Sequence, residues 1–261
     1  MLRYQAGPFA RRLGLVTALA IAAPASVPAQ TTLTAEGTEF VLTTPAGRTL
    51  RSVDLAGAKL NLSVAGREVE LTIRSVVEDA HAVGGRVLLH HFTLPNEAGG
   101  QVDLCAPDGD GRSLGFPVPD GHGGFDLTCT SGAIGKCIRW GYRLWEDEPA
   151  RSRLAALHRA CVHMARADYG GSGRSTTRNG MRIDLYDDLG IETPADDSSL
   201  LFEAGWTEHG AVCVNHPRVA GNITLSEIEA RWPQLAGKTG AICTEAFARS
   251  NGALLFNRSA P

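Results

Sequence analysis

Six cysteines, all placed after an apolar N-terminal leader, constrain this 261-residue chain more than any other feature. The leader carries three arginines and no acid, runs apolar from Leu13 to Ala23, and ends in small residues at Ala25 and Ala29. These are the marks of a secretory signal peptide, and the run is too short to cross a bilayer as a helix. We therefore expect a signal peptide over residues 1–29 and a secreted or periplasmic product, with a retained membrane anchor as the alternative.

The cysteines are even in number and widely spaced. They are Cys105, Cys129, Cys137, Cys161, Cys213 and Cys243. Because no C-x-x-C pair occurs, the spacing favours three disulfides in an oxidising compartment over a zinc site, whose ligands come in close pairs. Six cysteines allow 15 connectivities. We expect one disulfide between Cys105 and Cys129, and we expect the other four cysteines to form disulfides that stabilise the C-terminal half.

The charge of the exported part argues against two classes of partner. The leader holds three of the 25 basic residues and none of the 28 acidic ones, which leaves a formal charge of −6. A mildly acidic surface repels nucleic-acid phosphates and anionic lipids. We expect no nucleic-acid partner, no stable membrane insertion after leader removal, no metal and no cofactor. The expected partner is an unidentified extracellular or periplasmic ligand or protein.

Residues 31–130 predict a β-rich domain. Apolar and polar residues alternate over 60–64 and over 69–73, on either side of an Ala65-Gly66 turn, which is typical of a half-buried hairpin. Further strands are expected at 39–43 and 86–93, and loops at 95–100, 107–111 and 117–124. Many short strands separated by turns favour an antiparallel sandwich or a partly open barrel.

Residues 131–251 predict a disulfide-stapled α+β domain, followed by a C-terminal tail over 252–261. Leu154, Leu157, Cys161 and Met164 recur on one helical face, predicting a helix over 149–166. Two shorter helices are expected, one from a Thr224/Glu227 capping box to Pro233 and one after Cys243 that ends at Asn251-Gly252. Two hairpins are expected, one turning at Asn179-Gly180 and one at residues 207–210. The fold class is therefore α+β.

The short motifs that suggest catalysis or metal binding lack the neighbouring residues that such sites require. Ser113 lies in a G-x-S-x-G pattern, but the prolines that follow cannot open the helix that a nucleophilic serine of this type requires. Asp108 and Asp110 resemble the start of a calcium loop that lacks its later ligands. His90 and His91 point to opposite faces of a strand, so they cannot chelate one ion together. No catalytic residue is assigned.

Six residues are candidates for a binding site: Asp168, Tyr169, Arg174, Arg178, Asp184 and Asp187. The glycine-rich loop that carries Arg174 and Arg178 could hold an anion or a sugar acid through main-chain N–H groups and guanidinium groups. The aspartates could supply the carboxylate pair of a glycosidase, whose separation the sequence does not give. For all of them, ordinary cap and turn roles are the alternative.

Several segments of the second half together resemble the ADYC domain of exported bacterial proteins. They are 132–145 (GAIGKCIRWGYRLW), 166–169 (RADY), 178–180 (RNG), 183–187 (IDLYD), 202–206 (FEAGW) and 211–214 (AVCV). The resemblance covers residues 131–251 well and the β-rich half only loosely. It implies export and a cysteine-rich fold, and it implies no activity.

The chain departs from this family where the family's name places a cysteine, because Gly170 follows Tyr169. If that cysteine is normally bridged, its partner must also be absent here, and we take Trp232 as the position of the lost partner. The leading interpretation is a non-catalytic, disulfide-stabilised binding or structural module. The alternative is a secreted hydrolase that acts on glycan or ester bonds.

Overall fold

A computed structural model describes residues 31–64, 66–145, 150–197 and 199–260. The predicted signal peptide and the start of the predicted long helix at Pro149 lie outside these residues. The described chain forms three antiparallel sheets and four α-helices, which confirms the α+β class. Within the part of the chain that the structure describes, no helix combines the length and the apolar character needed to cross a bilayer.

The β-rich half contains two sheets. The first has the order β1-β2-β3, and the second has six strands in the order β4-β5-β6-β8-β9, with β7 paired to β6. Their bounds are β1 Thr32–Glu36, β2 Glu39–Thr43, β3 Thr49–Arg51, β4 Lys59–Val64, β5 Arg67–Glu78, β6 Leu88–Pro95, β7 Gln101–Asp103, β8 Gly115–Pro119 and β9 Phe125–Cys129. The predicted hairpin is the β4–β5 pair, with Leu60 opposite Leu71.

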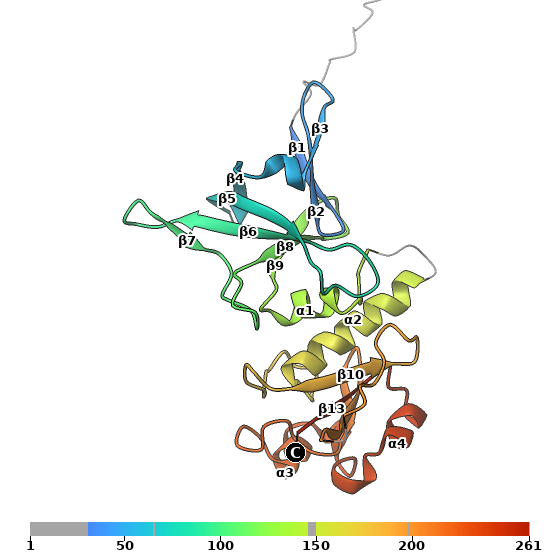
Figure 1. Cartoon of the computed structure of the whole chain (residues 1–261). Helices are drawn as coiled ribbons and strands as arrows, with labels where there is room; N and C mark the ends of the chain where they lie inside the picture. Colours follow the sequence, from blue (N-terminus) through green and yellow to red (C-terminus); the bar gives the residue numbers. More distant parts are fainter. Residues whose placement is uncertain (1–30, 65, 146–149, 198, 261) are drawn as a thin grey trace, which may run out of the picture.

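The two sheets share a core of alternating apolar side chains. Phe40 of β2 lies against Phe92 of β6 and Phe125 of β9, with ring centroids 6.0 Å and 5.2 Å away. These contacts follow from the period of two, which places every second residue of a strand on the same face. The small sheet stands on one part of the larger one (Figure 1). The result is an incomplete sandwich, and the antiparallel β-rich character that the sequence predicts is confirmed.

The second half is a four-stranded sheet with helices on both faces. Its order is β10-β13-β11-β12, and the bounds are β10 Ile183–Asp187, β11 Leu201–Thr207, β12 Gly210–Val214 and β13 Leu255–Ser259. The helices are α1 Ala133–Arg139, α2 Ala150–Arg166, α3 Leu225–Arg231 and α4 Glu245–Ser250. Leu185 faces the core beneath α2, whereas the adjacent Tyr186 faces the core beneath α4.

Three disulfides connect these elements. Cys105–Cys129 closes the β-rich half, Cys137–Cys161 joins α1 to α2, and Cys213–Cys243 joins β12 to the segment before α4. The expected Cys105–Cys129 bridge is therefore confirmed, and the remaining four cysteines staple the second half as expected. Disulfides of this kind persist in oxidising compartments.

The two halves are joined by polar contacts as well as by the chain. Asp79, just after β5, accepts hydrogen bonds from the guanidinium of Arg139 in α1, and the N–H of Val83 donates to the carbonyl of Arg139 at 2.8 Å. Arg143 donates to the carbonyls of Gly84 and Gly85 at 2.8 Å and 3.2 Å. Figure 1 shows α1 lying directly below the large sheet.

Three local expectations differ from the structure. Residues 117–119, expected in a loop, belong to β8. Their prolines are tolerated because the ring nitrogens point away from β9, toward a side where the strand needs no N–H donor. No hairpin forms around Asn179-Gly180, since the N–H of Thr176 donates to the carbonyl of Arg166 at the end of α2 instead of pairing with a strand. The expected tail contributes β13, whose Leu255 and Phe256 are fully buried, so those residues are part of the fold.

Candidate functional site

A large groove lies on the face of the six-stranded sheet. We call it the β-groove, and its volume is about 780 Å³. It is lined by Leu62, Ser63, Val69, Leu71, Leu94, Leu104, Asp120, Gly124, Phe125, Asp126, Leu127 and Cys129. Small-molecule and cofactor sites are concave, mostly apolar and of about 300–1,000 Å³, so the volume of the β-groove falls within the range of binding sites.

The groove exists because the small sheet covers only part of the large one. Leu71 is 1% exposed beneath the cover, whereas Leu62, Leu94 and Leu127 on the same apolar face are only half-buried. All of them occupy the inward positions of the period-two pattern. Apolar side chains that the fold leaves partly open to solvent indicate a surface that gains stability when something covers it.

One wall of the β-groove is an edge strand whose outer main-chain groups have no strand partner among the residues that the structure describes. β9 is the last strand of its sheet, and it pairs with β8 through Pro117↔Leu127 and Pro119↔Phe125. Because proline has no N–H, these are the positions where β8 donates nothing to β9. The main-chain N–H and C=O groups of Phe125 and Leu127 therefore point outward from the edge. The same two residues direct their side chains into the groove.

The only charged groups in the lining of the β-groove are carboxylates. Asp120 and Asp126 line it, and no lysine or arginine does. Hydrogen bonds from the N–H groups of His122 and Gly124 outweigh desolvation and lower the pKa of Asp120, so this carboxylate stays ionised at neutral pH. The groove thus combines an apolar floor, an open strand edge and a negative rim.

Among the six predicted binding residues, Asp168 and Tyr169 are buried and held by the chain itself. The carboxylate of Asp168 accepts hydrogen bonds from His163 at 2.9 Å and from the N–H groups of Ser172 and Gly173. The hydroxyl of Tyr169 donates to Glu203 at 3.0 Å. Burial raises the pKa of Asp168, but these donors outweigh it and leave the pKa below its ordinary value. Both residues organise the turn after α2.

Asp184 and Asp187 also bind main-chain groups. The carboxylate of Asp187 accepts from the hydroxyl of Tyr142 at 2.9 Å and from the N–H groups of Leu189 and Glu192, and Asp184 accepts from the N–H of Ala195. Arg174 is exposed. Arg178 lies at a second, small hollow between α1 and the loop before β10. Of the six candidates, Arg178 alone lines either of the two hollows.

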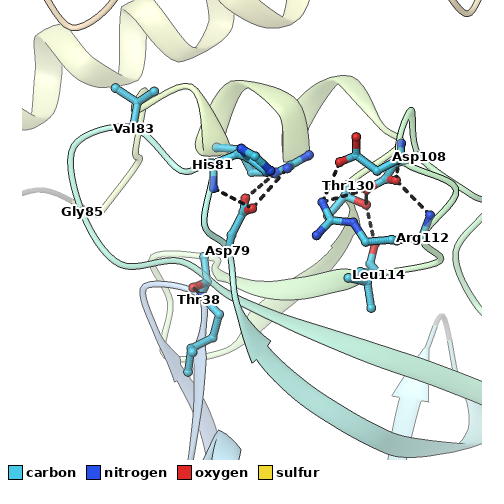
Figure 2. Close-up of polar contacts among 12 residues, drawn as sticks. Thr38, Asp79, His81, Val83, Gly85, Asp108, Arg112, Leu114 and Thr130 are labelled. Carbon is cyan, nitrogen blue, oxygen red and sulfur yellow. Dashed lines mark hydrogen bonds and ion pairs between the residues drawn. The ribbon is translucent and has the colours of Figure 1, made fainter.

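The sequence motif around Asp108 has a structural role at the base of the large sheet (Figure 2). Its carboxylate accepts hydrogen bonds from the N–H groups of Asp110 and Arg112 and from the hydroxyl of Thr130. Figure 2 shows Asp79 in a neighbouring cluster, where it accepts from the N–H of His81. Both carboxylates therefore tie loops of the β-rich half to α1 and the segment before it.

The β-groove was not predicted from the sequence. The alternation in β4 and β5 predicts which side chains share a face, but it does not show whether a second sheet covers that face. The Pro117-x-Pro119 pattern was the one signal in the sequence. Proline has no N–H, so the two residues of β9 opposite these prolines receive no hydrogen bond from them and direct their own main-chain groups away from β8.

Comparison with known proteins gives one match. The model of the ADYC domain matches residues 52–220, which is more than half of the chain and spans both halves of the fold. The matched region contains all the residues that line the β-groove and all of α1 and α2. No curated protein and no solved structure matches.

Proposed function

Since this chain belongs to the ADYC domain family, we propose that it is an exported, non-catalytic binding module that takes an extended peptide segment into the β-groove. The observation that carries the proposal is the juxtaposition of an apolar floor with the open edge of β9. Strand addition of this kind uses main-chain hydrogen bonds for affinity and alternating side-chain pockets for specificity.

The lining defines the expected peptide. Side chains at every second position face the same way in an extended chain, so apolar residues at alternate positions would contact Leu62, Leu94 and Leu127. A basic residue at one end would meet Asp120 and Asp126. The ligand class is therefore an extended segment of a protein with alternating apolar side chains and a lysine or arginine beside them.

The contacts of the candidate carboxylates support binding over hydrolysis. A general acid or base must be within reach of a substrate proton, whereas Asp168 and Asp187 each accept several hydrogen bonds from nearby main-chain N–H groups. Such carboxylates are typical of turns that hold loop geometry.

Fluorescence polarisation with a labelled hexapeptide, Lys-Val-Ser-Val-Thr-Leu, tests the proposal. We expect saturable binding that weakens about tenfold or more in Leu127→Asp, which places a charge in the groove. The matched control is Val77→Asp, because Val77 is 45% exposed on the same sheet outside the groove. A peptide that is N-methylated at alternate amides should also bind weakly, since it lacks the N–H groups that would donate to the edge of β9. Equal binding by Leu127→Asp and the control would refute the site.

Export after removal of residues 1–29 is part of the proposed function. The three disulfides support an oxidising compartment. Intact-mass measurement of protein recovered from the periplasm or medium should give a chain that begins at Gln30 and carries no free thiol. Material that retains the leader or carries six free thiols would contradict it.

A further inference from the structure

We propose that the small hollow between α1 and the loop before β10 binds an anionic oxygen group, the carboxylate of an acidic sugar or a phosphate. We call it the basic hollow. It is lined by Lys136, Trp140, Ala165, Thr177, Arg178, Asn179, Gly180, Met181, Ile183 and Arg218. Three of these residues are cationic and none is acidic. The hollow is separate from the β-groove, so this proposal does not depend on the peptide site.

The first argument is the buried guanidinium of Arg218. Its side chain is 1% exposed, and Nε and one terminal nitrogen donate to the two carboxylate oxygens of Glu203 at 2.9 Å and 3.0 Å. The other terminal nitrogen makes a long contact of 3.4 Å to the carbonyl of Ala165. An arginine has five N–H groups, and these contacts use one at each of the three nitrogens, which leaves, within the described residues, one N–H on each terminal nitrogen to donate to a ligand oxygen.

The second argument is that the two outer cations are not neutralised. Over the described residues, Lys136 has no ion pair or side-chain hydrogen bond, and Arg178 has only a contact of 3.3 Å from Nε to the sulfur of Met181. By contrast, Arg182 close by is paired with Asp197. The charge of Arg218 is balanced by Glu203, so it is the two unpaired cations, Lys136 and Arg178, that give the hollow a positive potential, although the whole chain has a formal charge of −3.

The third argument concerns how the hollow is built. Lys136 lies in α1 and Trp140 is the C-cap residue one turn later, and the Cys137–Cys161 bridge fixes this helix to α2. The opposite wall is held in place because the side-chain amide of Asn222 donates to the carbonyls of Thr176 and Thr177 at 2.8 Å and 3.4 Å. These supports keep the cations apart in the absence of a ligand, which favours binding through preorganisation.

The volume sets the size of the ligand group. The hollow measures about 70 Å³. A buried water needs about 10–15 Å³ on the same measure, so the space holds roughly five waters or one small oxyanion. The rest of a larger ligand would lie outside, against the indole of Trp140, which can pack on a sugar ring. Arginine pairs well with both carboxylate and phosphate.

The test is a titration of the whole protein at constant ionic strength, followed by amide NMR at Asn179 and Gly180. The probes are sodium glucuronate and sodium phosphate, with glucose as the neutral control. We expect saturable shifts with at least one anion and none with glucose. Binding of glucuronate alone identifies a carboxylate site for acidic sugars, whereas binding of phosphate identifies a phosphoryl site. If neither anion gives a saturable shift, the proposal is overturned.

Variants then locate the site. Lys136→Ala and Arg178→Ala should each weaken anion binding about tenfold or more, because each removes a charge-assisted hydrogen bond. Arg174→Ala is the matched control, since Arg174 is an exposed arginine of the preceding loop that does not line the hollow. Lys136→Arg should restore binding. The proposal fails if Arg174→Ala loses as much affinity as Arg178→Ala. Leu127→Asp in the β-groove should bind the anion normally, which keeps the two sites distinguishable.

Discussion

A single buried imidazole makes the β-rich half sensitive to acid. His90 is fully buried against Phe40 and Phe92, its Nε2 lies 2.8 Å from the hydroxyl of Ser52, and burial lowers its pKa to about 4. In the unfolded chain the same group takes a proton near pH 6.5, so its contribution to stability is present above pH 6.5 and lost as the pH falls through 4.

We expect the free energy of unfolding to fall by about 3 kcal/mol between pH 6.5 and pH 4 on account of His90. Denaturant unfolding at closely spaced pH values measures this slope. The His90→Gln variant, which keeps a hydrogen-bonding group for Ser52, should have lower stability at neutral pH and a flatter curve. Parallel curves for the variant and the parent protein would show that His90 is not responsible.

Glu192 contributes a pH dependence of stability with the opposite sign. Burial, followed by repulsion from Asp187 and Asp184, raises the pKa of Glu192 to about 7. The folded state holds this proton more tightly than the unfolded state, so stability falls as the pH rises from about 4.5 through 7. After allowance for solvent screening of a half-exposed group, Glu192→Gln should stabilise the protein by about 1 kcal/mol at pH 8 and by nothing at pH 4. The exposed Glu97→Gln serves as control, and thermal unfolding that is unchanged at pH 8 would contradict the assignment.

At the scale of elements, the contact between the turn after α2 and the end of α3 is unusually close. A Cβ added to Gly170 would lie 2.0 Å from the indole nitrogen of Trp232. We expect Gly170→Ala to cost about 1–3 kcal/mol because the indole must move. In a Trp232→Ala background the same change should cost much less. A double-mutant cycle by denaturant unfolding measures this coupling, and additive costs would rule it out.

The same contact fits the interpretation that positions 170 and 232 hold a cysteine pair in relatives. We expect the Gly170→Cys/Trp232→Cys variant to form a fourth disulfide when it is exported. Intact mass before and after thiol alkylation reports the bond, and two free thiols in the folded variant would exclude the pairing. Each single-cysteine variant is the control, because neither can form the bridge.

Local sequence signals predicted α2, α3 and α4 but missed α1, whose N-cap Gly132 offers no side-chain capping group. The Thr224/Glu227 capping box and the stripe that includes Leu157 and Cys161 gave α3 and α2 because caps and helical faces depend on residues three or four positions apart. The proline-containing part of β8 was missed, since Pro117 is tolerated there only because β8 pairs with β6 at a single position, His90↔Gly115, and needs no N–H beyond it. Strand pairing depends on residues distant in sequence, and the same limit hid β13.

At the scale of the whole molecule, the candidate sites were mostly beyond the reach of the sequence. Arg178 was predicted as an anion ligand, and the structure places it beside Lys136 and Arg218 from distant segments. Asp168 and Tyr169 attract attention as polar residues in a distinctive motif, yet they hold the fold together. The β-groove depends on what the small sheet leaves uncovered, a property of the assembled halves that no single segment encodes.

The junction between the halves contains one buried ion pair, beside the contacts of Arg143 and the packing of Ile138 against Leu89 and Phe116. The side chain of Asp79 is 0% exposed and that of Arg139 is 15% exposed. Burial alone would raise the pKa of Asp79, but hydrogen bonds from Arg139 and from the N–H of His81 outweigh it and hold the pKa below its ordinary value. Removing one member of such a pair leaves the other desolvated without compensation.

We therefore expect Asp79→Asn to cost about 2–3 kcal/mol and to uncouple the halves, each of which has its own core and disulfide. Calorimetry should change from one transition to two, and hydrogen exchange should show the β-rich half opening first, because it has the smaller core and a single bridge. Glu78→Gln is the matched control, since Glu78 is the adjacent residue and its pair with Arg86 is exposed. If Asp79→Asn still unfolds in one transition at the temperature of the control, the junction is held by packing and by Arg143 instead of by this pair.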